Sequence, residues 1–255
     1  MVSISPIHSK AALLIDEDTK KRRYMVISDL HIGFESHINT RGITFDEMTF
    51  FDEMIRELSD LIESNKVQAL ILLGDLKSTV GSISRQEWQK IPLFFKLLSE
   101  ITDIYFVPGN HDSNIRFLMP ENINVMGSKG MVLDDTLLVH GHTMPTTARS
   151  YIKKIVMGHI HPVFLRHNSV INGQRVWIYL KIIKEALFPG SQGTLDLIIL
   201  PAYNRYLYAI NERRYTKSIS PIIDKAIKSN AVQQALVVSL DGSIVGGIET
   251  LLKII

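Results

Sequence analysis

The stretch VQALILLGD, residues 67–75, decides the fold class of this chain, because an almost continuous apolar run ends directly in Gly74-Asp75. A short apolar run bounded by turn residues is typical of a strand that is buried on both faces. The same arrangement recurs four more times, in Tyr24–Ser28, Ile104–Val107, Thr136–Val139 and Ile155–Met157, each followed by polar residues or glycine. We therefore expect several parallel strands in a buried sheet.

Helical segments separate these strands. Thr44-Phe45-Asp46-Glu47 and Ser84-Arg85-Gln86-Glu87 both have the spacing of a helix capping box, and each precedes an amphipathic stretch. We expect the two helices to extend to about Asn65 and Glu100. Strands that alternate with helices predict an α/β layered fold.

The last third of the chain has a mostly β pattern. Strands are expected at Val176–Leu180, Asp196–Leu200 and Tyr206–Ile210. We expect residues 1–210 to form the main domain and residues 211–255 to form an appendage. This appendage would contain a helix near Pro221–Lys228 and a hairpin turning at Asp241-Gly242. The segment Ala235–Ile255 offers an edge through which we expect the chain to form an oligomer.

Composition excludes several classes of protein. The 255 residues are 45% hydrophobic and carry 28 Lys+Arg against 26 Asp+Glu, which argues against disorder and against a dominant attraction to nucleic acid. No apolar stretch reaches the roughly 18 residues of a membrane span, and the first residues lack a signal-peptide pattern, so we expect a cytoplasmic protein with no membrane partner. The chain has no cysteine and nine histidines. Imidazole, carboxylate and amide groups are therefore the metal ligands available.

Side chains that can bind a metal ion follow each of the five apolar runs that end in polar residues or glycine. They are Asp29, His31, Asp75, Asn110, His111, His140, His159 and His161. Loops at the carboxyl ends of strands converge in α/β folds, so we expect these side chains to lie together. In Asp29-Leu30-His31 an extended backbone would point both ligands to one side, and His159-Ile160-His161 repeats the spacing.

Gly109-Asn110-His111-Asp112 is the most specific of these motifs. The Asn110 amide oxygen is a potential metal ligand, and the His111 imidazole is suited to acid–base chemistry. Asp112 is expected to orient that imidazole. The sequence therefore predicts both metal binding and a catalytic histidine at one edge of the sheet.

Together these motifs resemble those of the calcineurin-like metallophosphoesterase superfamily over about residues 24–165. More narrowly, Ile27–Glu35, Gly74–Lys77, Gly158–Pro162 and Leu197–Asn204 are similar to a prokaryotic SbcD-related, PdeM-like branch of phosphoesterases. Ser78 departs from that branch, which usually has histidine after the lysine. The resemblance implies a four-layer α/β sandwich in which two mixed β-sheets are flanked by helices.

The same resemblance implies a site with two divalent metal ions. One ion would be held by Asp29, His31 and His161, the other by Asn110, His140 and His159, and Asp75 would bridge both. The implied metal is manganese, with iron, zinc or nickel as alternatives. A hydroxide shared by the ions would attack phosphorus, while His111 stabilises the developing charge or protonates the leaving oxygen.

Three further side chains are candidates for contact with a substrate phosphate. They are His142, Lys77 and Arg149. Lys77 follows the Gly74-Asp75 motif, but it has an equally simple interpretation as a solvated lysine. Arg149 follows the His140-Gly141-His142 loop and also suits a solvated surface position.

The resemblance implies a phosphodiesterase or nuclease that hydrolyses nucleic acid or nucleotides and takes part in DNA repair or nucleic-acid processing. At 255 residues we expect it to act on short single-stranded ends or with a helicase or repair-complex partner. Phosphomonoesterase or cyclic-nucleotide phosphodiesterase activity is an alternative. A non-catalytic scaffold, like the retromer subunit of this fold, is an alternative of another class that the intact ligand set disfavours.

Overall fold

A computed structural model describes residues 2–35, 47–145, 151–166, 168–207 and 220–255 of the chain. The elements in chain order are β1 (Val2–Pro6), β2 (Leu13–Glu17), β3 (Arg22–Ile27), α2 (Glu47–Ser64), β4 (Ala69–Leu73), α3 (Arg85–Ser99), β5 (Asp103–Val107), η1 (Ile115–Leu118), β6 (Asn124–Val125), β7 (Met131–Leu133), β8 (Thr136–Val139), β9 (Lys154–Met157), β10 (Val163–Phe164), β11 (Gln174–Ile183), η2 (Lys184–Ala186), β12 (Thr194–Ile199), α5 (Pro221–Lys228), β13 (Val232–Ser239), β14 (Ile244–Gly246) and α6 (Ile248–Ile254). The five apolar runs predicted as strands are β3, β4, β5, β8 and β9.

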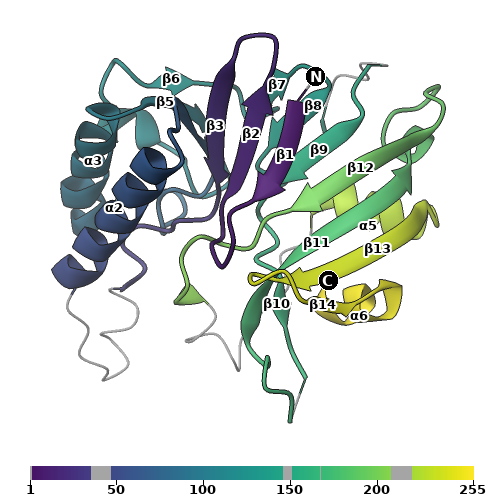
Figure 1. Ribbon diagram of the computed structural model, residues 1–255. Helices are drawn as coiled ribbons and strands as arrows, with labels where there is room; N and C mark the ends of the chain where they lie inside the picture. The colour runs from purple at the N-terminus through teal and green to yellow at the C-terminus, as the bar shows by residue number, and fades with distance from the viewer. Residues whose placement is uncertain (1, 36–46, 146–150, 167, 208–219) are drawn as a thin grey trace.

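Two mixed sheets form the centre of the molecule. The first has the order β1-β2-β3-β4-β5-β6, and the second has the order β14-β13-β11-β12-β9-β8-β7, with β10 paired to β11. Strands β3 to β6 are parallel to one another, as are β8, β9 and β12, while the remaining pairs are antiparallel. Figure 1 shows α2 and α3 on the left of the sheets and α5 and α6 on the right. The expected arrangement of two mixed sheets flanked by helices is confirmed.

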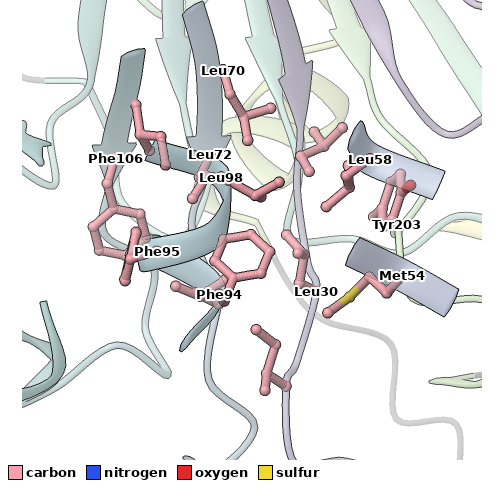
Figure 2. Close-up of a cluster of buried hydrophobic side chains, with 14 of the residues drawn as sticks. Leu30, Met54, Leu58, Leu70, Leu72, Phe94, Phe95, Leu98, Phe106 and Tyr203 are labelled. Atoms are coloured by element: carbon pink, nitrogen blue, oxygen red, sulfur yellow. The ribbon is translucent and has the colours of Figure 1, made fainter. Parts of the chain in front are cut away.

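Three hydrophobic cores separate the four layers. In the first, Phe94, Phe95 and Leu98 of α3 pack with Leu70 and Leu72 of β4 (Figure 2). The middle core joins residues of both sheets, and the third lies between the second sheet and the helices α5 and α6. Strand β4 is fully buried because its alternate residues face the first and the middle core. This double burial explains its continuous apolar sequence.

Local signals predicted helix α3 correctly. Ser84 is the N-cap of α3, its side chain accepts a hydrogen bond from the Glu87 backbone, and the Glu87 carboxylate accepts one from the Ser84 backbone. The capping box predicted there is therefore confirmed. The one predicted at Thr44–Glu47 falls largely outside the described residues. None of the helices in the described part of the chain is long and apolar enough to cross a membrane.

The carboxyl-terminal segment is part of the second sheet and not an appendage to it. Strand β13 pairs with β11 over most of its length, from Val176↔Ser239 to Ile182↔Val232. The helix at Pro221–Lys228 and the turn at Asp241-Gly242 are found as expected. The boundary expected at 210/211 thus does not separate two folding units, because residues on both sides share one sheet and one core. Strand β14 is the edge strand, and self-association through it stays a prediction.

The strand expected at Tyr206–Ile210 is not present at its first two residues. Tyr206 lies in a turn and Leu207 is helical, and the other three expected residues, 208–210, lie outside the described residues. The aromatic and apolar pattern there reflects packing of this turn, where the Tyr206 ring contacts the Phe50 ring of α2.

Candidate metal centre

The metal-binding side chains follow the ends of parallel strands in both sheets. Strands β3, β4 and β5 of the first sheet lead to Asp29, Asp75 and Asn110, and strands β8 and β9 of the second sheet lead to His140 and His159. Backbone hydrogen bonds join these loops directly. The Asp29 N–H donates to the Gly74 carbonyl at 3.1 Å, and the Gly158 N–H donates to the His140 carbonyl at 3.0 Å.

The first group of potential ligands combines both sheets. Asp29, His31, Asp75 and His161 place ligand atoms within 4.8 Å of one another. His161 Nε2 lies 3.0 Å from Asp29 Oδ1, and His31 Nε2 lies 3.4 Å from His161 Nε2. Two carboxylates and two imidazoles facing one point are a donor set that suits a divalent transition metal.

The second group shares Asp75 with the first. Asp75, His140 and His159 place ligand atoms within 4.8 Å of one another. His140 Nε2 lies 3.3 Å from Asp75 Oδ2 and 3.2 Å from Asn110 Oδ1, so the amide oxygen of Asn110 faces the same point. The Asp75 carboxylate is therefore common to the two groups of ligands.

The ligand loops are not extended. The backbone φ angle is positive at Asp29 (58°), His31 (44°), Asp75 (52°), His159 (73°) and His161 (50°). Left-handed conformations cost free energy, about 1 to 3 kcal/mol each for non-glycine residues, and they gather at functional sites. The i, i+2 spacing brings two ligands together here through tight left-handed turns, so the expectation of an extended backbone at residues 29–31 is wrong.

A neighbouring backbone carbonyl orients His140. Its Nδ1 lies 2.8 Å from the Leu73 carbonyl, which can only accept a hydrogen bond, so Nδ1 carries the proton. Nε2 is left to face Asp75 and Asn110. This is how metal-binding histidines are usually held.

Charge and burial place most of the donors in the form that binds metal. Burial and nearby histidines lower the pKa of His31 to about 3, and burial and the charge of His140 lower the pKa of His159 to about 4. Burial alone would raise the pKa of Asp29, but the charges of His161 and His140 outweigh it and lower the pKa to about 2. Burial also opposes ionisation of Asp75, whose pKa is nevertheless lowered by His140.

His140 differs from the other histidines. Burial disfavours its charged form, but Asp75 and Asp29 outweigh burial and raise its pKa to about 9. The negative charges of Asp75 and Asp29 next to the buried His140 imidazole favour a cation beside them, either a proton on the imidazole or a metal ion. The residues present therefore fit the pair of divalent ions that the resemblance implies.

A glycine permits the close contact between the two sheets. A Cβ atom at Gly158 would lie 2.6 Å from Asp29 Oδ2 and 2.5 Å from Ser28 Oγ. Its φ angle is not in the left-handed region, so the need for glycine here is purely one of space. The Asp29 carboxylate uses that space to accept a hydrogen bond from the His159 N–H at 3.0 Å.

His111 stands beside both groups and is partly exposed. Its Nδ1 lies 2.7 Å from the Ser78 carbonyl, and its Nε2 lies 3.9 Å from Asp75 Oδ2. The Ser78 carbonyl fixes the proton on Nδ1 and turns Nε2 toward the ligands. The imidazole is thus oriented by a backbone carbonyl, at the position where the sequence departs from the branch it resembles.

Asp112 does not orient His111 as expected. Its carboxylate accepts four backbone hydrogen bonds, from the N–H groups of Asp75 (2.7 Å), Leu76 (2.9 Å), Lys77 (3.2 Å) and Gly109 (2.7 Å). It therefore holds together the two loops that carry Asp75 and Asn110. Asp112 is a positioning residue for the ligands.

Lys77 is neither a phosphate contact nor a solvated lysine. Its side chain is fully buried, and its ammonium group donates to the carbonyls of Thr79 and, at 2.8 Å, Ser82. Burial lowers the pKa of Lys77. The ammonium group of Lys77 therefore holds the loop of residues 79–82 from its inner side.

The two remaining phosphate candidates have different outcomes. The His142 ring centroid lies 5.3 Å from that of His140 and 6.2 Å from that of His159, so His142 stands at the rim of the second group. Its buried Nδ1 has no hydrogen-bond partner among the described residues. Arg149 lies outside the described residues.

The loop that holds His111 depends on a carboxylate that the sequence assigned only to helix capping. Glu87 is fully buried and accepts hydrogen bonds from Ser78 N (2.9 Å), Thr79 N (2.8 Å), Thr79 Oγ1 (2.7 Å) and Ser84 N (2.6 Å). The capping-box spacing predicts the hydrogen bond between Glu87 and Ser84. No local sequence pattern predicts that the same carboxylate also binds the loop at residues 78–79.

We expect Glu87→Gln to destabilise the protein by about 2 to 3 kcal/mol, because charge-assisted hydrogen bonds become weaker and one amide hydrogen faces an N–H donor. Burial alone would raise the pKa of Glu87, but hydrogen bonds from Ser84 and Thr79 lower it below the ordinary 4.5. The ionised form therefore stabilises the fold above pH 4.5, and this contribution is lost as pH falls through the lower folded-state pKa. Urea unfolding between pH 3 and 7 tests both effects.

The exposed Glu63→Gln is the matched control and should leave stability within about 0.5 kcal/mol of the wild type. A Glu87→Gln protein as stable as this control would contradict the role given to Glu87.

Fold and site together define a hydrolase that uses divalent metal ions. The family model of calcineurin-like phosphoesterases matches residues 22–187, and the chain belongs to this family. It is accordingly a metal-dependent phosphoesterase. No curated protein matches the chain.

Two solved structures are similar to this one. The first is the nuclease MPE of Pseudomonas putida, with 18% sequence identity and a TM-score of 0.50 over 94% of this chain and 98% of that chain. The second is Yfce, a phosphoesterase from E. coli, with 15% identity and a TM-score of 0.39 over 88% of this chain and 97% of that chain. The first likeness supports the fold described above.

Proposed function

We propose that this phosphoesterase uses two metal ions and hydrolyses phosphodiester bonds in nucleic acid or nucleotides. The observation that carries the proposal is the place of Asp75, whose carboxylate belongs to both groups of ligands. A shared carboxylate is the usual device for holding two cations side by side. A role in nucleic-acid processing such as DNA repair forms part of the same proposal.

Manganese is the metal that we propose for both positions. The donors are carboxylates, imidazoles and one amide oxygen, and the chain has no thiolate that would favour a softer ion. Iron, zinc and nickel accept the same donors, so metal content and reactivation of the metal-free protein decide between them.

When bound, divalent ions would supply an activated water and neutralise charge on the phosphoryl oxygens. The chain's own contribution is the orientation of His111. With its Nδ1 hydrogen donated to the Ser78 carbonyl, a protonated imidazole can donate only through Nε2, which lies on the side of Asp75. His111 is thereby placed to donate a hydrogen bond to a phosphoryl oxygen or a proton to the leaving oxygen.

The charge around the site favours a diester over a monoester. A phosphomonoester dianion is usually met by lysine or arginine in addition to metal. Lys77, the cation nearest in sequence to Asp75, is turned into its own loop and bound there. Among the described residues, the rings of His111 and His142 stand next to those of His31 and His140, and an imidazole carries at most one positive charge, which suits the single negative charge of a diester.

The test compares bis-p-nitrophenyl phosphate with p-nitrophenyl phosphate in the presence of manganese, nickel or cobalt. We expect metal-dependent hydrolysis of the diester, a slower reaction with the monoester, and a loss of about 10² to 10⁴-fold in His111→Ala. His8→Ala, at an exposed position remote in sequence from the motifs, is the matched control and should retain full activity. A wild-type protein that is inert with all three metals, or faster on the monoester, would overturn the proposal.

A further inference from the structure

Arg175, at the start of β11, is held against the loop that supports the first metal ligand. Its Nη1 donates to the carbonyls of Ala202 and Tyr203, both at 2.7 Å. That loop is in turn bound to the Asp29 segment, because the Tyr203 N–H donates to the Ser28 carbonyl at 2.8 Å. The guanidinium is therefore connected to the Asp29 segment of the metal centre through one loop, residues 202–203.

Most of the hydrogen-bonding capacity of Arg175 is unused. Its Nε and Nη2 have no hydrogen-bond partner, and it takes part in no ion pair, among the residues that the structure describes. The neighbouring cations differ, since Lys10 pairs with Glu57 at 2.6 Å and Arg205 with Glu53 at 3.0 Å. Burying part of a guanidinium without a carboxylate partner costs free energy, and a bound anion would offset this cost by pairing with the charge.

The metal centre and this guanidinium border the same hollow in the protein surface. A small hollow is lined by His161, Arg175 and Arg205, with apolar walls at Val163 and Leu207. The same two arginines also line an adjoining groove of about 640 Å³ along α2, but the carboxylates of Glu53, Glu57 and Asp60 line that groove too, so an anion is expected on the side of His161. A chain-like anion with one group at the metal ligands would find its next negative charge beside Arg175.

We propose that Arg175 binds the phosphate adjacent to the one being hydrolysed, so that the preferred substrate is a nucleotide chain with at least two phosphates. This inference rests on the phosphodiesterase function proposed above and specifies its substrate. The planar guanidinium suits phosphate because it offers parallel N–H groups to two oxygens at once.

The kinetic test uses three substrates that differ in the number of phosphates: bis-p-nitrophenyl phosphate and the thymidine dinucleotide TpT, with one each, and the trinucleotide TpTpT, with two. Arg175→Gln removes the positive charge and keeps a polar side chain with an N–H donor, although this side chain is shorter than that of arginine. We expect its kcat/KM to fall about 10 to 100-fold on TpTpT and to change less than about twofold on the other two. Arg85→Gln, at an exposed position at the start of α3, is the matched control.

A binding measurement makes the test independent of turnover. Fluorescein-labelled oligo(dT) is titrated with His111→Ala and with the double variant His111→Ala/Arg175→Gln over a range of salt concentrations. Loss of one phosphate contact should weaken binding and reduce the slope of log affinity against log salt by about 0.7. An unchanged affinity and slope, or an equal loss of kcat/KM on all three substrates, would overturn the inference. Failure of the wild type to hydrolyse any diester would instead reject the proposed function, while the binding slope still decides on the subsite.

Discussion

Asp75→Asn is expected to abolish metal-dependent phosphodiester hydrolysis, with a loss of roughly 10³-fold or more in kcat/KM. The Asp75 carboxylate belongs to both ligand groups, and its Oδ1 also accepts the His111 backbone N–H at 2.9 Å. An amide has the same shape but no charge, and only one of its two terminal atoms can bind a cation. One substitution therefore weakens both metal positions at once.

Calorimetric titration with manganese measures the cause directly. The wild type should bind metal and show a higher Tm in its presence, whereas Asp75→Asn should show weak binding and little change in Tm. Asp196→Asn removes a carboxylate that pairs with Lys181 on the far part of the second sheet, and it should behave as the wild type. Wild-type activity or two tight manganese sites in Asp75→Asn would contradict the shared position of Asp75.

Asp112→Asn is expected to destabilise the protein by about 3 to 5 kcal/mol and to reduce activity with it. Each Asp112 oxygen accepts two backbone N–H groups, so the amide nitrogen of asparagine must face two hydrogen-bond donors in either orientation. The loops that carry Asp75 and Asn110 would lose their common anchor. Urea unfolding and bis-p-nitrophenyl phosphate hydrolysis measure the two effects.

The combination of effects separates two roles for Asp112. If it oriented the His111 ring, Asp112→Asn would reduce activity and leave the free energy of unfolding unchanged, as expected for His111→Ala. The structure predicts the opposite order, with a large loss of stability for Asp112→Asn. Asp196→Asn again serves as the matched control.

Much of the architecture is encoded locally and was predictable. Apolar runs such as Ala69–Leu73 can be recognised in the sequence because a strand buried on both faces needs apolar residues at every position. The capping box at Ser84 can be recognised because its hydrogen bonds join residues only three positions apart. The convergence of the metal ligands was predictable because the carboxyl ends of parallel strands share one edge. Asp29, His31, Asp75, Asn110, His140, His159 and His161 all lie where this rule places them.

The errors arose where contacts between distant segments decide the structure. Asp112 binds backbone groups of residues 75–77, more than thirty positions away, and adjacency in sequence wrongly suggested His111 as its partner. Lys77 looked exposed because its carbonyl partners become accessible to it only when the loop is folded. Residues 211–255 looked like an appendage because the pairing of β13 with β11 crosses about fifty residues of chain.

Each ligand group draws on both sheets, and this has a mechanical consequence. Asp29, His31 and Asp75 belong to the first sheet, while His140, His159 and His161 belong to the second. A bound ion would therefore cross-link the two sheets. Metal loading would then stabilise the whole fold, by about 2.7 kcal/mol for a single ion at a hundred times its Kd, and a chelator would loosen the sandwich as well as stop the chemistry.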